Sequence, residues 1–104
     1  MFWGLLQRQE RWFAAELYRQ KGELLLRQGH AEAAEGLYRK ALSIAAEQGA
    51  KLWELRAAMS LAELRCGQGH QTAARDLLAP VYAWFTEGFD TLDLKAAKAL
   101  LESL

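Results

Sequence analysis

The sequence predicts an all-α fold, an α-α superhelix in which two antiparallel helix pairs stack side by side and a last helix caps their end. Alanine, leucine, glutamate, arginine and glutamine, all strong helix formers, dominate the 104 residues, and the chain has one proline. Glycines fall at a few points that separate helix-length segments. The chain also repeats itself forty residues apart, which is typical of stacked helix-turn-helix arrays.

The repeat consists of short matches in the same order. Glu23-Leu24, Gln28-Gly29-His30, Ala33-Ala34 and Leu37 recur as Glu63-Leu64, Gln68-Gly69-His70, Ala73-Ala74 and Leu77. In both copies the glycine lies between two helix-forming segments, where it ends the first helix. We therefore expect the two Gln-Gly-His corners to lie at the same end of the molecule.

The first helix pair is predicted over residues 9–28 and 31–48, so that repeat one covers about 9–48. Its first helix has two neighbouring apolar stripes. Phe13, Leu17 and Leu24 form one stripe, and Ala14, Tyr18, Gly22 and Leu25 form the other. Its second helix has apolar residues at three- and four-residue steps: Ala34, Leu37, Tyr38, Ala41 and Ile44.

The second pair is predicted over residues 50–65 and 71–86, so that repeat two covers about 50–86. Pro80 lies inside its second helix and removes a backbone donor, which predicts a bend near 76–77. After Gly88, Thr91 is a candidate N-cap for a capping helix over 92–103. Residues 1–104 thus form a single domain.

Charge and composition narrow the classes of partner. Thirteen basic residues balance thirteen acidic ones, whereas nucleic acid and anionic membranes attract a basic field, so we expect neither as a partner. A lone cysteine, Cys66, cannot form an intrachain disulfide and fits a reducing compartment. The first residues lack the basic stretch of a signal peptide. These features predict a cytoplasmic protein.

Motifs for catalysis are absent from the sequence. It has neither a Gly-Lys-Thr/Ser phosphate loop nor a Gly-x-Gly-x-x-Gly fingerprint. His30 and His70 occupy equivalent corners in successive pairs, which stacking would hold on the order of 10–20 Å apart, too far to share a metal. We expect no enzyme activity, no cofactor and no metal.

At these positions the chain resembles the tetratricopeptide repeat family. Tyr18, Gly22, Leu25, Ala34, Tyr38 and Ala41 follow that family's order of large and small residues, and the second copy has Ala58, Leu61, Ala62, Ala74, Leu78 and Val81. Lys21 departs from the pattern, because an apolar residue is usual there. The forty-residue period is also longer than the ~34 residues of the family.

A closer resemblance covers nearly the whole chain. It rests on Lys51-Leu52-Trp53-Glu54-Leu55-Arg56, on the run from Leu77 to Thr91, and on Asp93-Leu94-Lys95-Ala96-Ala97. These stretches are similar to the C-terminal repeats of bacterial regulators that contain a class III adenylate or guanylate cyclase domain and a STAND-type ATPase. The resemblance implies a signalling context for the chain.

The tetratricopeptide resemblance implies a protein or peptide partner on a concave face built by the first helix of each pair. The expected partner-binding residues are Glu16, Arg19, Glu23, Leu26, Arg27, Arg56, Met59 and Glu63. Their mixed charges around an apolar floor suit an extended or helical peptide. Glu23 and Glu63 would repel a terminal carboxylate, so we do not expect a chaperone-tail clamp.

Two alternatives to this interaction module remain open. The chain could act as a regulatory C-terminal tail inside a cyclase–ATPase polypeptide, packed against the other domains. It could also be a self-associating scaffold that forms a homo-oligomer. The edge for self-association would be apolar residues near the N-terminus, Trp3, Leu5, Leu6 and Trp12.

Overall fold

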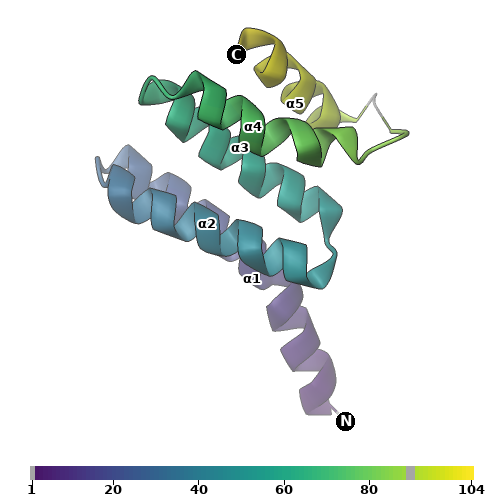
Figure 1. The fold of residues 1–104 in the computed structure, drawn as a ribbon. Helices are drawn as coiled ribbons and strands as arrows, with labels where there is room; N and C mark the ends of the chain where they lie inside the picture. The colour runs from purple at the N-terminus through teal and green to yellow at the C-terminus, as the bar shows by residue number, and fades with distance from the viewer. Residues whose placement is uncertain (1, 89–90) are drawn as a thin grey trace.

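The structure is a computed structural model that describes the backbone of residues 2–88 and 91–104 and the side chains of 14–88 and 91–104. Across these residues the chain is helical, without strands, which confirms the all-α prediction (Figure 1). The helices are α1 (Phe2–Arg27), α2 (Ala31–Gln48), α3 (Lys51–Gly67), α4 (Gln71–Ala83) and α5 (Leu92–Ser103).

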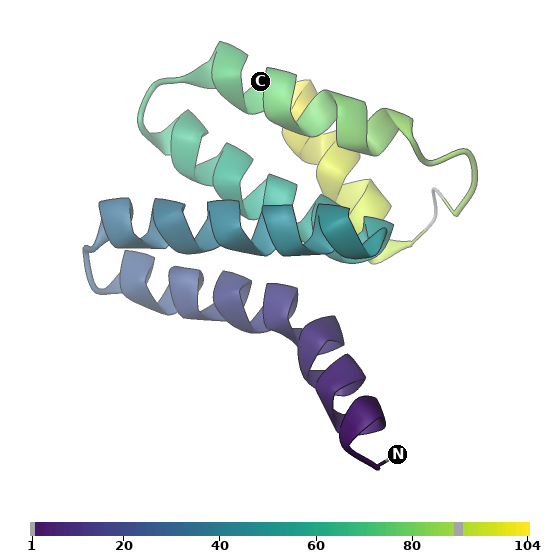
Figure 2. The same ribbon diagram turned by 60° about the horizontal axis from the view of Figure 1, so that its bottom comes forward.

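The helices form two antiparallel pairs with α5 at one end. Helix α1 packs against α2, α3 packs against α4, and α2 and α3 form the seam between the pairs (Figures 1 and 2). Helix α5 contacts both α3 and α4. The α1–α2 and α3–α4 corners lie at the same end of the molecule in both views, as the repeat predicts.

Both Gln-Gly-His corners close with the same hydrogen bond. Gly29 and Gly69 have φ of 88° and 84°, the left-handed region that favours glycine. The following histidine then donates its backbone N–H to a carbonyl five residues earlier, from His30 to Leu25 at 2.9 Å and from His70 to Arg65 at 2.8 Å. The forty-residue repeat is therefore a repeat of one turn geometry.

Inside each pair, a small residue on the first helix faces a large residue on the second. Gly22 of α1 lies against the ring of Tyr38, and both residues are buried. Forty residues later the same two positions hold Ala62 and Leu78, which share a core cluster. From the first pair to the second, the residue on the first helix becomes larger and its partner on the second helix becomes smaller, so the two changes in volume compensate each other.

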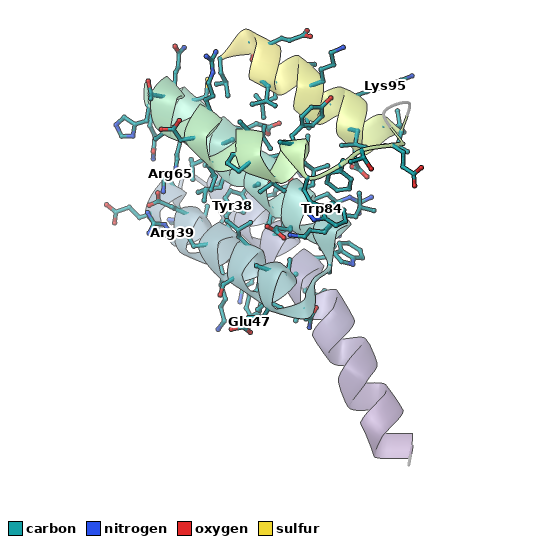
Figure 3. The ribbon with its side chains drawn as sticks, turned by 45° about the vertical axis from the view of Figure 1, so that its right-hand side comes forward. Tyr38, Arg39, Glu47, Arg65, Trp84 and Lys95 are labelled. Carbon is teal, nitrogen blue, oxygen red and sulfur yellow. The ribbon has the colours of Figure 1, made fainter. Side chains whose placement is uncertain are left out.

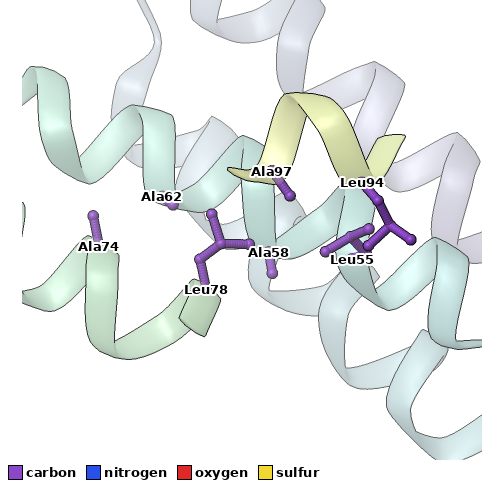
Figure 4. Packing of buried hydrophobic residues seen from close by; sticks show 7 residues of the cluster. All are labelled: Leu55, Ala58, Ala62, Ala74, Leu78, Leu94 and Ala97. Atoms are coloured by element: carbon purple, nitrogen blue, oxygen red, sulfur yellow. The ribbon is translucent and has the colours of Figure 1, made fainter. Parts of the chain in front are cut away.

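The largest core cluster joins the second pair to α5 (Figure 4). Its buried members are Leu55, Ala58 and Ala62 of α3, Ala74 and Leu78 of α4, and Leu94 and Ala97 of α5. Tyr82 and Phe85 pack against it from the end of α4. The last helix is thus held by the same core that holds α3 to α4.

A second cluster and an ion-pair group form the seam between the pairs. The buried members of this cluster are Ala34 and Tyr38 of α2 and Leu61 and Leu64 of α3. At the edge of this seam, Glu35 of α2 pairs with Arg65 of α3 at 3.4 Å and with Arg39 at 3.6 Å (Figure 3). Apolar burial therefore dominates the contact, because a partly exposed ion pair of this kind adds ~1 kcal/mol or less.

Some predicted boundaries are wrong. Helix α1 starts at Phe2 instead of Gln9, and it runs through Gly4, whose unfavourable helix propensity of about 1 kcal/mol does not end the helix there. Helix α4 ends at Ala83 instead of Thr86, since the N–H groups of Trp84 and Phe85 bond three residues back and tighten the last turn. Thr91 is the N-cap of α5, but its side chain makes no capping hydrogen bond. The bend at Pro80 stays a prediction.

The apolar stretches in these helices are short. Among the residues that the structure describes, no helix is both long enough and sufficiently uncharged to span a lipid bilayer.

Candidate functional site: a groove between α1 and α3

Two adjoining cavities form one groove between the first helices of the two pairs. The larger, of about 560 Å³, is lined by Glu23, Leu26, Arg27, Ala31, Tyr38, Ser60, Glu63, Leu64, Gly67 and Gln68. The smaller, of about 280 Å³, is lined by Arg19, Glu23, Arg56, Met59, Ser60, Glu63 and Asp93. The two cavities share Glu23, Ser60 and Glu63 and therefore lie next to each other.

The groove gathers the side chains that the sequence places on the concave face. Seven of the eight line its cavities: Arg19, Glu23, Leu26, Arg27, Arg56, Met59 and Glu63. The eighth, Glu16, is 8% exposed and accepts hydrogen bonds from Arg19. Glu16 is therefore placed to orient Arg19 and is too buried to meet a partner directly.

Sequence analysis missed several lining residues. Tyr38 and Ala31 belong to α2, which the prediction left out of this face. Asp93 enters from α5, whose position depends on the packing of three helices. Leu64 was detectable, since it lies one residue after Glu63 in the repeated Glu-Leu pair.

A chain of ion pairs crosses one end of the groove and ties α1, α3 and α5 together. Arg19 donates to Glu23 at 2.7 Å and also binds Glu16. Arg56 of α3 donates from Nη2 to Asp93 of α5 at 3.1 Å and approaches Glu16 of α1 at 3.7 Å. These arginines are held in place before any partner arrives, which lowers the entropy cost of binding.

The two glutamates with shifted pKa values are shifted in opposite directions. Burial raises the pKa of Glu16, but the hydrogen bond from Arg19 and the charges of Arg19 and Arg56 outweigh it, so the net pKa is lowered. Burial, followed by the charge of Glu23, raises the pKa of Glu63. Among the described side chains, Glu63 makes no ion pair.

The other end of the groove is apolar. Leu26 is partly exposed there, next to Tyr38 and Leu64. The repeat-related glutamates Glu23 and Glu63 line the groove where this end meets the ion-pair chain. The site therefore combines an apolar floor with the carboxylate of Glu63, which makes no ion pair among the described side chains.

Residues with other predicted roles lie elsewhere. His30 and His70 are the N-caps of α2 and α4, and neither side chain makes a capping hydrogen bond. Cys66 is a free, half-buried thiol. Within the described side chains, no three His, Cys, Asp or Glu residues are arranged to hold a metal ion.

The predicted self-association edge falls on the first half of α1. The backbone there is helical, and this part of α1 diverges from α2 and projects away from the other helices (Figure 2). The side chains of Trp3, Leu5, Leu6 and Trp12 lie outside the described residues.

Comparison of the chain with protein-family models, with curated proteins and with solved structures finds no match.

Proposed function

We propose that this protein is a non-catalytic interaction module that binds a peptide or protein segment in the groove between α1 and α3. The observation that supports this most directly is the groove itself, whose larger cavity of about 560 Å³ combines an apolar floor with an unpaired carboxylate. Concave sites of this size, mainly apolar with a few placed polar groups, are typical of ligand pockets.

The lining specifies the kind of segment that fits. An apolar side chain of the partner would cover Leu26 and Leu64. A lysine or arginine beside it would meet Glu63, because Glu23 already shares its charge with Arg19. A segment that brings a terminal carboxylate would be repelled by both glutamates.

A selection experiment tests this proposal on the full chain. A displayed peptide library is panned against the protein, and the affinity of enriched peptides is measured by calorimetry. We expect Leu26→Glu to weaken binding at least about tenfold, since it removes apolar contact and adds a charge. The matched control is Leu92→Glu, an exposed leucine of α5 that lines neither cavity of the groove. Peptides that bind both variants equally would contradict the proposal.

The same experiment separates the two alternative functions. An interaction module binds a separate polypeptide, whereas a regulatory C-terminal tail of a cyclase–ATPase signalling protein packs against domains of its own chain. A self-associating scaffold would form a homo-oligomer in light scattering without any peptide. Recovery of groove-specific peptides from a monomeric protein supports the interaction module over both.

A further inference from the structure

One face of α1 is apolar and exposed, although the equivalent face of α3 is buried. Subtracting the forty-residue period from Ala57, Leu61 and Leu64 of α3 gives Leu17, Lys21 and Leu24 of α1. The α3 residues are 1%, 2% and 7% exposed. By contrast, Leu17 and Leu24 are 62% and 54% exposed, and Lys21 is exposed as well.

What covers the face of α3 is visible in the same molecule. Leu61 and Leu64 pack against Ala34 and Tyr38 of α2, an antiparallel neighbour. The two helices α1 and α3 share their turn geometry and their packing against the second helix of each pair. The face of α1 that carries Leu17 and Leu24 is therefore built to lie against a helix, as its counterpart does.

From this equivalence we infer that the face of Leu17, Lys21 and Leu24, called here the α1 outer face, docks an amphipathic α-helix of a different protein. This surface is distinct from the groove, and the inference does not depend on the proposed function. The helix would cover both leucines with an apolar ridge and present a carboxylate to Lys21.

Helix α1 continues past the position equivalent to the start of α3, so no helix is joined to it there through a tight turn of the kind that joins α2 to α3. Helix α3 begins at Lys51, directly after the tight turn at Gly49 and Ala50. The equivalent position on α1 is Arg11, and there the helix runs on without a turn back to Phe2. A helix that covers this face therefore cannot be joined to α1 by a tight turn equivalent to the one at Gly49 and Ala50.

A second copy of this protein does not fit the face well. The surface that α2 presents to α3 is already covered within each copy, and α5 covers the corresponding end of the second pair. If two α1 outer faces packed antiparallel with Leu17 against Leu24, the two Lys21 side chains would meet near the symmetry axis. Like charges at that position disfavour the arrangement.

Lys21 gives the docking helix a recognisable charge pattern. Its counterpart Leu61 is buried in the seam, so α1 carries a cation where α3 carries an apolar side chain. Among the described side chains, Lys21 makes no ion pair. A partner helix with a glutamate or aspartate between two apolar residues would complete this face.

The test uses the full chain and a displayed library of helical peptides with acidic, neutral or basic residues between two apolar positions. We expect enrichment of peptides with an acidic residue there. We expect Leu17→Lys with Leu24→Lys to weaken their binding at least about tenfold, because two apolar contacts are lost. Leu92→Lys on α5 is the control and should leave the affinity unchanged.

The charge swap Lys21→Glu makes the test specific. It should reverse the preference of the library from acidic to basic peptides without affecting folding, because Lys21 is exposed. Peptides that bind the double leucine variant as well as the parent would overturn the inference. So would a concentration-dependent dimer of the parent protein that the leucine substitutions dissociate, since a second copy would then cover the face.

Discussion

Gly22 and Tyr38 are in such close contact that no side chain fits between them. A Cβ atom added at Gly22 would lie 2.7 Å from Cε1 and 2.9 Å from Cδ1 of the Tyr38 ring. It would also lie 3.3 Å from the backbone oxygen of Ala34. The glycine therefore sets the distance between α1 and α2, and the tyrosine fills the space that it leaves.

Gly22→Ala should destabilise the protein in spite of the better helix propensity of alanine. Overpacking costs about 1–3 kcal/mol and the propensity gain returns about 1 kcal/mol, so a net loss of up to about 2 kcal/mol is expected. Urea denaturation followed by circular dichroism measures it. Gly36→Ala is the matched control, because nothing lies within 4 Å of the added Cβ. It should stabilise by about 0.5–1 kcal/mol, and a stabilising Gly22→Ala would contradict the packing argument.

Combining Gly22→Ala with Tyr38→Leu should restore part of the lost stability. The double variant reproduces the pairing of Ala62 with Leu78 in the second helix pair. In a double-mutant cycle we expect the combined loss to be smaller than the sum of the single losses by about 1 kcal/mol or more. Additive effects would show that the two residues do not compensate each other.

Glu16→Gln should destabilise the protein at neutral pH, and the difference should shrink in acid. The lowered pKa of Glu16 means that its ionised form stabilises the fold above the ordinary value of 4.5. That contribution is lost as the pH falls through the lowered pKa. We expect a loss of about 1–2 kcal/mol at pH 7, from the charge-assisted bonds to Arg19. Thermal unfolding of parent and variant, measured from roughly pH 3 to pH 7 so that Glu16 titrates within the range, checks this pH dependence.

Glu63→Gln should have the opposite effect. The pKa of Glu63 is raised by burial and by Glu23, so ionisation of this group destabilises the folded state. Its favourable contribution is complete below the ordinary value of 4.5 and is lost as the pH rises through the raised pKa. The variant should be more stable than the parent at neutral pH and equal to it in acid. A less stable variant at neutral pH would mean that Glu63 has a favourable partner.

Breaking the Arg56–Asp93 pair should loosen α5 in particular. The two side chains meet at 3.1 Å and are about two-thirds covered, so a coupling of about 0.5–1 kcal/mol is expected in a cycle of Arg56→Gln and Asp93→Asn. Hydrogen exchange of the α5 amides should speed up more than that of α2 amides. Uniform acceleration across both helices would show that the pair acts on global stability instead.

Local chemistry made much of this fold predictable. The glycines of the two Gln-Gly-His corners mark turns that need a left-handed residue, and the helix formers between them leave few other structures. The concave-face residues were predictable as well. They lie on the first helix of each pair, and an antiparallel repeat brings equivalent helices side by side.

The end of the groove that α5 forms could not be predicted in this way. Asp93 reaches Arg56 across 37 positions of the chain, and only the packing of Leu94 and Ala97 onto α3 and α4 brings it there. Glu16 has the same helical spacing as its half-buried neighbours Arg19 and Glu23, yet it is buried. Its burial depends on Arg56 of another helix, which helical periodicity does not contain.

The sequence by itself determined the helices, the forty-residue turn geometry and seven of the residues that line the groove, because these depend on short-range periodicity and on glycine. The tertiary structure decided which of the two apolar stripes of α1 is buried. Both stripes have the same helical period, but α2 covers the one that contains Gly22, while Leu17 and Leu24 stay exposed. Periodicity identifies an apolar face, and only the position of a neighbouring helix determines whether that face is covered.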